Sequence, residues 1–264
     1  TRAGTVVLGT GALAVGTRRA YDSLLESSLR SSLSDLRSQA PIIDYSNRVI
    51  DLLGDENATL TSALDQFFSS FRDLALDASS ELRRNSVISE SQGLASRFNE
   101  IGAQLRSVDS DTLNALEFRV TELNSLSDQL SIVNKKLSRQ ANLESQPPDL
   151  LNTRDLLLQK ISGLIKVKVT EVANGEVSVS LGDNANSLLL VDKGNRTTVG
   201  LNQRSASLPV GLDLVLDPTG SAENLNSITS GEIGGLLSFR GSTLKDSLEK
   251  INQLAVAVSR EVND

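Results

Sequence analysis

The chain has 264 residues, of which 39% are hydrophobic and 22% are charged, and its formal net charge is −7. Histidine and cysteine are both absent, which excludes disulfides, Cys/His zinc sites and the Ser-His-Asp and Cys-His groups of nucleophilic enzymes. Basic residues are scattered as doublets and not clustered, which argues against a nucleic-acid partner. No apolar run approaches the ~18 residues needed to cross a bilayer, so we expect no membrane partner.

Residues 1–17 are rich in threonine, valine and glycine and are predicted to form an extended arm that ends in a turn. The spacing Gly9-x-Gly11-x-x-Ala14 is similar to a dinucleotide-binding turn. That motif requires a helix that begins within the glycines and continues, whereas Gly16 interrupts it and no βαβ unit follows. We therefore interpret the segment as an arm and predict no cofactor.

A first helix is predicted to begin near Arg18, and Pro41 is expected to break or kink it. The helical pattern then continues to Gly54, a residue type that commonly ends a helix. One face of the first part is apolar and is predicted to point inward, whereas the other is rich in serine and is predicted to be solvated or loosely packed. The apolar face contains Tyr21, Leu25, Leu29, Leu33 and Leu36, and the serine face contains Ser27, Ser28, Ser31 and Ser32.

A second helix is predicted from the helical spacing of apolar residues between Leu60 and Leu74. It contains three of the six phenylalanines in the chain, Phe67, Phe68 and Phe71. Their spacing favours packing in the core. The alternative is a patch that docks a partner.

The longest predicted element runs from about Leu82 to about Gln140 and contains no proline. Its apolar residues alternate in steps of three and four, the heptad pattern of a helix that lies along another helix. If it is unbroken, its ~55 residues span about 80 Å, which predicts a rod. The predicted seam contains Leu94, Phe98, Ile101, Leu105, Val108, Leu113, Leu116, Val120, Leu123, Leu130 and Leu137.

Polar residues interrupt this seam at two kinds of position. Asp109, Ser110 and Asp111 resemble a cation site, but we interpret them as a solvated kink or a stutter in the heptad. Ser127 and Asn134 occupy seam positions, where a polar residue weakens packing but fixes the register.

After the turn at Pro147 and Pro148, residues 149–165 are predicted to form a shorter helix. The apolar period then changes from 3.6 to 2, which indicates strands. Asn174-Gly175 between two alternating runs is a strong hairpin signal. We predict a small antiparallel β unit with strands at residues 165–170, 177–181, 187–191, 196–201 and 211–216.

Residues 219–232 are predicted to be a loop, and a final helix contains Leu244, Leu248 and Val258 on one apolar face. That face must pack against the earlier helices. The predicted fold is therefore α+β but mainly α, an elongated coiled-coil-like bundle of long helices with a small antiparallel β insertion. We assign residues 1–164 and 221–264 to a helical rod domain that begins with an extended arm, and residues 165–220 to the β-rich insertion.

Several short blocks, taken in order, point to a family. They lie at residues 9–16, 19–30, 50–53, 64–68 and 149–155, and the most specific is Gly231-Glu-Ile-Gly-Gly-Leu-Leu-Ser-Phe-Arg240. Together they resemble the flagellar hook-associated protein 1 (FlgK) family and span nearly the whole chain. The family's terminal coiled-coil segments have no counterpart here, and the chain begins without methionine, so we expect it to be a fragment.

The resemblance implies a structural protein at the junction between the bacterial flagellar hook and filament. It implies export through the flagellar type III channel without a cleaved signal peptide, and an extracellular location. The implied partners are the hook protein, the filament-side junction protein and further copies of the chain in a ring. We predict no catalytic, cofactor-binding or metal-binding residue. The alternative from another class is a stalked adhesin whose β unit binds a ligand, and an enzyme is the least favoured hypothesis.

Overall fold

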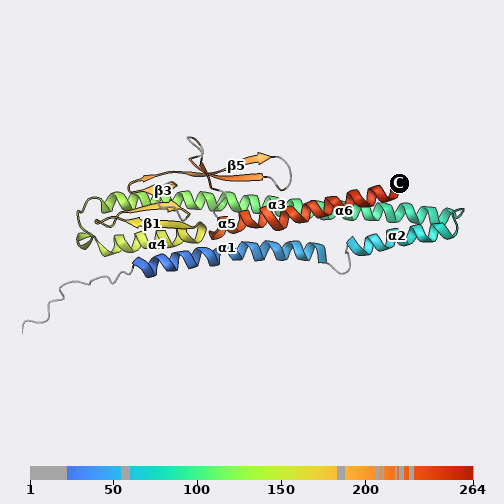
Figure 1. The fold of residues 1–264 in the computed structure, drawn as a ribbon, viewed down its shortest axis with the longest axis horizontal. Coiled ribbons are helices and arrows are strands. Elements are labelled where there is room, and N and C mark those ends of the chain that lie inside the picture. The colour runs from blue at the N-terminus through green and yellow to red at the C-terminus, as the bar shows by residue number, and fades with distance from the viewer. Residues whose placement is uncertain are drawn as a thin grey trace, which may run out of the picture.

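The structure is a computed structural model that describes residues 23–54, 60–182, 188–205, 209, 211–217, 219, 223–225 and 229–263. The predicted arm, the turn at residues 9–14 and the predicted first turn of the helix from Arg18 lie outside these residues. Figure 1 shows an elongated rod in which one helix, α3, runs along most of the length. Helices α1 and α2 follow one another along one side of α3, α5 and α6 lie along another side, and the strands and α4 lie at one end.

Helix α1 spans Ser23–Gly54 and continues through Pro41, so the predicted break at this proline does not occur. A proline inside a helix costs about 3 kcal/mol because it removes a hydrogen bond and crowds the preceding turn. Here the cost is offset by tertiary packing, since α1 packs along α5 (Gly231–Phe239) at the level of the proline ring.

Helix α2 spans Leu60–Leu76, and helix α3 spans Glu81–Leu137 without interruption. The Ser80 hydroxyl caps α3 by accepting from the backbone N–H of Arg83 at 3.4 Å. With 57 residues at ~1.5 Å each, α3 is about 85 Å long. The rod predicted from the heptad pattern is therefore confirmed. At residues 109–111, where we expected a solvated kink or a stutter in the heptad, the helix is not interrupted, and the buried positions Val108, Thr112, Leu116 and Val120 follow one another in steps of four, which is a stutter.

The predicted seam of α3 is largely the buried one. Ser127 and Asn134 are buried within it, as their heptad positions indicate. Near the polar interruption, Thr112 is buried and Leu113 is only partly buried, because a tertiary ion pair occupies this level of the bundle. The buried apolar residues of α3 are Leu94, Ile101, Leu105, Val108, Leu116, Val120, Leu123, Leu126, Leu130, Val133 and Leu137.

Helix α4 spans Pro148–Leu164, after a single 3-10 turn at Leu143–Ser145, and begins with a proline at a position that needs no N–H. The predicted hairpin follows: β1 (Val167–Glu171) pairs antiparallel with β2 (Val177–Leu181). The Gly175 N–H donates to the Val172 carbonyl at 2.9 Å, and Gly175 has a φ of 85°. This left-handed conformation is why glycine is needed at the turn.

The predicted antiparallel β insertion is confirmed, and its strands form two sheets. The first sheet has the order β1-β2-β3-β4, with β3 at Leu189–Asp192 and β4 at Asn195–Arg196. The second has the order β5-β6-β7, with strands at Val199–Ser205, Gly211–Leu216 and Glu223–Asn224. The strand predicted at residues 196–201 is divided between the sheets, and β7 lies in a segment predicted to be a loop.

The C-terminal helical segment begins earlier than predicted. Helix α5 starts at Gly231, inside the segment assigned to a loop, and continues through a π-helical turn (Arg240–Leu244) into α6 (Lys245–Asn263). Two adjacent glycines disfavour a helix by about 1 kcal/mol each, so intrinsic propensity does not predict α5. Its burial against α1, α3 and α4 overrides that cost.

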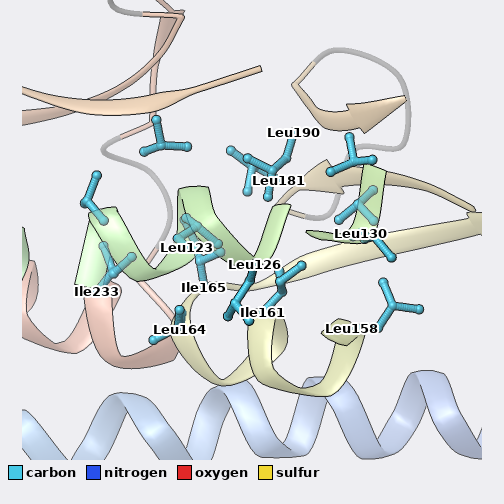
Figure 2. Close-up of a cluster of buried hydrophobic side chains, with 14 of the residues drawn as sticks. Leu123, Leu126, Leu130, Leu158, Ile161, Leu164, Ile165, Leu181, Leu190 and Ile233 are labelled. Atoms are coloured by element: carbon cyan, nitrogen blue, oxygen red, sulfur yellow. The ribbon is translucent and has the colours of Figure 1, made fainter. Parts of the chain in front are cut away.

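Two hydrophobic clusters lie along α3. In the larger one, Leu123, Leu126 and Leu130 of α3 meet α4 and the first sheet, as Figure 2 shows with Leu158, Ile161, Leu181 and Leu190. The smaller one joins Ile101, Leu105 and Val108 of α3 to Val49, Phe239, Leu244 and Leu248. The sheets therefore share one core with the helices.

Candidate assembly surfaces and the contacts that position them

Asn134, at a seam position of α3, binds the backbone of the first sheet. Its side-chain N–H groups donate to the carbonyls of Val177 at 2.8 Å and Lys193 at 2.6 Å, and its side-chain oxygen accepts from the Val177 N–H at 3.1 Å. The side chain is fully buried. The polar residue predicted to fix register thus connects the rod to the sheet.

Asn124 makes the equivalent contact with the second sheet. Its amide donates to the Val199 carbonyl at 2.8 Å, and its oxygen accepts from the Val199 N–H at 2.8 Å. Val199 is the first residue of β5, so this contact lies where the chain passes from the first sheet to the second. Both sheets are therefore fixed to α3 by asparagines, whose side-chain amides form hydrogen bonds with strand backbone groups as a neighbouring strand would.

Replacing Asn134 with leucine keeps the volume but leaves three backbone groups without this partner, and the two that belong to Val177 are buried. Each such group costs about 1–3 kcal/mol, so we expect the free energy of unfolding to fall by about 3–5 kcal/mol. Urea unfolding followed by circular dichroism measures this loss. The matched control is Asn114→Leu, at an exposed position of the same helix, which should change stability by less than about 0.5 kcal/mol. Equal effects of the two substitutions would contradict the assigned role.

Arg154 of α4 joins that helix to the hairpin. Its guanidinium lies 2.8 Å from Asp155 and 2.6 Å from Glu171, and it donates to the Gly175 carbonyl at 2.7 Å. The side chain is almost completely buried, and its two carboxylate partners compensate the charge. The arginine lies in one of the sequence blocks that suggested the family, and its contacts explain why arginine stands there.

A buried ion pair joins α3 to the π-helical turn between α5 and α6. Arg240 lies 2.7 Å from the Asp109 carboxylate and donates to the Asp109 carbonyl at 2.7 Å and the Thr112 hydroxyl at 2.6 Å. Burial lowers the pKa of Arg240 below its usual value, and the adjacent carboxylate opposes that shift. Asp109 is therefore not a solvated residue or a cation ligand, while exposed Asp111 lies 3.7 Å from Arg48.

The glycines of the 231–240 block allow backbones to meet. A Cβ atom on Gly235 would lie 2.1 Å from the Ser38 carbonyl oxygen of α1. On Gly231, which has a φ of 80°, it would lie 2.5 Å from the Leu164 backbone. Glu232, between them, pairs with Arg119 of α3 at 2.8 Å. This block is thus the point where α1, α3, α4 and α5 meet.

The packing of α1 agrees with one half of the prediction and contradicts the other. The serine face of Ser27, Ser28, Ser31 and Ser32 is exposed, as predicted, but the apolar face is not the inner one. Arg30, Ser34 and Ser38 are buried, whereas the leucines predicted to face inward are exposed, apart from the half-buried Leu33. The small buried serines let α5 approach closely, so they form the inner face. We define the outer row of α1 as the exposed apolar residues on its opposite side: Leu25, Leu29, Leu36, Ile43 and Ile50.

The phenylalanines of α2 divide between core and surface. Phe67 is buried, which confirms the core interpretation for that residue. Phe68 and Phe71 pack against it edge-on, with ring centroids 5.2 and 4.9 Å away, and remain partly exposed. Leu76 and Leu82, at the tip of the α2–α3 hairpin, are also exposed.

Within the described ranges, no group of three or more acidic side chains is placed to hold a metal ion. A search of the same residues finds no helix with the length and apolarity required for a membrane span. The contacts that sequence reasoning missed are those of Asn124, Arg240 and the outer row. The sequence offered only weak signals for them. Asn124 stands beside the seam, Arg240 follows an apolar segment, and the residues of the outer row from Leu29 to Ile50 have a seven-residue spacing.

Comparisons with known proteins agree with this architecture. A family model described as the helical domain of the flagellar hook-associated protein FlgK matches residues 46–264. Flagellar hook-associated protein 1 of Salmonella typhimurium is 25% identical over 97% of this chain and 46% of its own length. The Bacillus subtilis protein of the same name is 27% identical over 73% of this chain and 38% of its own length.

A solved structure is also similar. The flagellar hook junction protein FlgK from Burkholderia pseudomallei matches with a TM-score of 0.70 and 27% identity, over 83% of this chain and 39% of that chain. The chain thus spans about half the length, or less, of the relatives it matches. Because the family model covers most of the sequence, and the fold agrees, the chain belongs to the FlgK family of flagellar hook-associated proteins.

Proposed function

We propose that the chain is part of a structural protein that joins the flagellar hook to the filament by packing subunits side by side. The observation on which this rests is the family match over residues 46–264, since relatives are named hook-associated or hook junction proteins. Family membership favours this role over a stalked adhesin. The proposed partners are the hook protein, the filament-side junction protein and further copies of the chain.

The architecture suits such a role. An uninterrupted α3 is connected to the sheets by Asn124 and Asn134 and to the C-terminal helices by the Asp109–Arg240 pair. These are contacts that fix elements relative to one another, and we propose that they have no enzymatic task. The proposed location is outside the cell, after export through the flagellar type III channel without a cleaved signal.

We also propose the division into a rod made of residues 1–164 and 221–264 and an insertion of residues 165–220. Helices from both parts of the chain support it, because α1 packs along α5 and α4 packs on both. The insertion shares its hydrophobic core with α3 and α4, so we expect it to fold with the rod and not alone.

Deleting the gene in the bacterium that encodes it tests the proposed function. We expect cells that retain hooks but lack attached filaments, release filament protein into the medium and fail to swim. Electron microscopy of isolated hooks and a swimming assay measure these effects, and expression of the intact gene should reverse them. Filaments joined normally to hooks in the deletion strain would contradict the proposal.

A further inference from the structure

The turn of the β1–β2 hairpin contains the only Asn-Gly pair in the sequence, Asn174-Gly175. Asparagine is a thermolabile residue, and it is most reactive before glycine, which has no side chain to shield its backbone nitrogen. In this reaction the Gly175 nitrogen loses its proton to a base and attacks the side-chain amide carbon of Asn174. The new C–N bond closes a succinimide ring, and the side-chain nitrogen takes up a proton and leaves as ammonia. Water then opens the ring, which leaves aspartate or isoaspartate at position 174.

The backbone of the turn holds the two reacting groups apart. The Gly175 N–H donates to the Val172 carbonyl at 2.9 Å, which closes a β-turn with Ala173 and Asn174 at its centre. Neither central residue has a positive φ, so the turn is of type I and Asn174 has a ψ of about 0°. At that ψ the Gly175 nitrogen lies on the side of the Asn174 backbone nitrogen. Ring closure requires it on the side of the Asn174 Cβ atom.

The side-chain amide of Asn174 is held by Glu176. Its oxygen accepts from the Glu176 N–H at 3.1 Å, and its N–H donates to the Glu176 carboxylate at 2.6 Å. Rotation of the amide toward Gly175 would break both bonds and leave the buried carboxylate without this donor. The nitrogen that must gain a proton to leave therefore faces an acceptor and not an acid.

Two buried side chains from outside the hairpin fix this conformation. Gln146 donates to the Asn174 carbonyl at 2.7 Å, and Arg154 of α4 donates to the Gly175 carbonyl at 2.7 Å. Leu143 covers the glycine, since a Cβ atom on Gly175 would lie 2.9 Å from the Leu143 Cδ1 atom. A change of ψ at Asn174 turns its carbonyl away from Gln146. The reaction therefore requires the turn to open locally.

The product would not fit the closed turn. Aspartate at position 174 replaces the N–H donor beside Glu176 with a second carboxylate, so two like charges would meet at hydrogen-bond distance. Isoaspartate routes the backbone through the side chain and adds one atom to the chain before Gly175. Either product prevents the turn from closing again as it was, so the reaction is a permanent mark of its opening.

We propose that Asn174 is a modification site that the folded hairpin keeps unreactive. It is converted to aspartate or isoaspartate only in molecules in which this turn has opened. The inference does not rest on the proposed function, because its reactants are Asn174, Gly175 and water.

Incubation of the purified protein in mildly alkaline buffer tests the inference, because base removes the proton from the Gly175 nitrogen. One sample is kept folded and a second is unfolded in urea, and a sample that is not incubated gives the background. Mass spectrometry of the tryptic peptide 169–193 measures the conversion of residue 174. We expect the folded protein to react at least tenfold more slowly than the unfolded protein. Rates within twofold of each other would overturn the inference.

Gln146→Leu tests whether the contacts around the turn suppress the reaction. It keeps the volume but removes the donor to the Asn174 carbonyl, so we expect the folded variant to react at least fivefold faster than the unaltered protein. The matched control is Gln140→Leu at an exposed position, which should leave the rate unchanged. An unchanged rate in Gln146→Leu that is folded by circular dichroism would also overturn the inference.

A second variant decides the question if Gln146→Leu does not fold. Leu143→Ala uncovers Gly175 without removing a hydrogen bond, and Leu143 is already 39% exposed, so the variant should fold. We expect it to react at least threefold faster than the unaltered protein when folded. Leu156→Ala, at an exposed position of α4, is its control and should leave the rate unchanged. Equal rates for the two leucine variants would overturn the inference.

Discussion

Replacing Gly235 with alanine is expected to lower the free energy of unfolding by about 3 kcal/mol. In an exposed helix the same change stabilises by up to ~1 kcal/mol, because alanine has the higher helix propensity. Here the added Cβ would lie 2.1 Å from a backbone oxygen of α1, so one helix must move away from the other. Urea unfolding of the purified protein measures the loss.

Gly93 provides the matched control. It lies inside α3, and a Cβ atom at this position would meet nothing within 4 Å. Gly93→Ala is therefore expected to stabilise the protein by about 0.5–1 kcal/mol. The two substitutions should thus have opposite signs. If Gly235→Ala stabilises the protein as Gly93→Ala does, then α1 and α5 are not in backbone contact.

Removing only one partner of the Asp109–Arg240 pair is expected to lower the free energy of unfolding by more than Gly235→Ala does. Arg240→Met leaves the Asp109 carboxylate buried without its cation, and removal of one partner of a buried pair costs about 3–5 kcal/mol. Asp109→Leu should cost a similar amount, because Arg240 then remains buried. The double variant should cost much less than the sum, since no unpaired charge is left. A double-mutant cycle of urea unfolding measures the difference.

The exposed pair Lys245–Glu249 is the control for this experiment. Its atoms are 3.7 Å apart and both side chains are half exposed, so Glu249→Gln should cost less than about 0.5 kcal/mol. A cost of Arg240→Met as small as this would show that Asp109 is solvated, as the sequence alone suggests.

The parts of the fold that sequence reasoning predicted are those determined by local periodicity. The heptad residues of α3 identify the long helix and most of its buried side, because they repeat over many turns. Asn174-Gly175 identifies the first hairpin, because Gly175 has the left-handed conformation that the turn requires. Asn134 was identified as a residue that fixes register, although its partners in the sheet were not.

The parts that sequence reasoning missed depend on contacts between distant residues. Arg240 and Asp109 lie 131 positions apart, so nothing near Asp109 indicates its cation. Helix α5 forms despite its glycines because they allow close contact with α1. The prediction of which side of α1 faces inward was wrong, because it assumed that the apolar side of a helix is its internal side.

The distribution of buried residues along α3 has a mechanical consequence. Residues 81–93 of this helix are all at least partly exposed, and only α2 packs extensively on that part, whereas the segment from Leu116 onward is enclosed by helices and two sheets. The rod is therefore thinner at the α2–α3 tip, its slender end, than at the end that carries the two sheets, its base. A bending load applied at the α2–α3 tip would be absorbed by elastic flexing of the slender end, and the base, with its larger cross-section, would keep its shape.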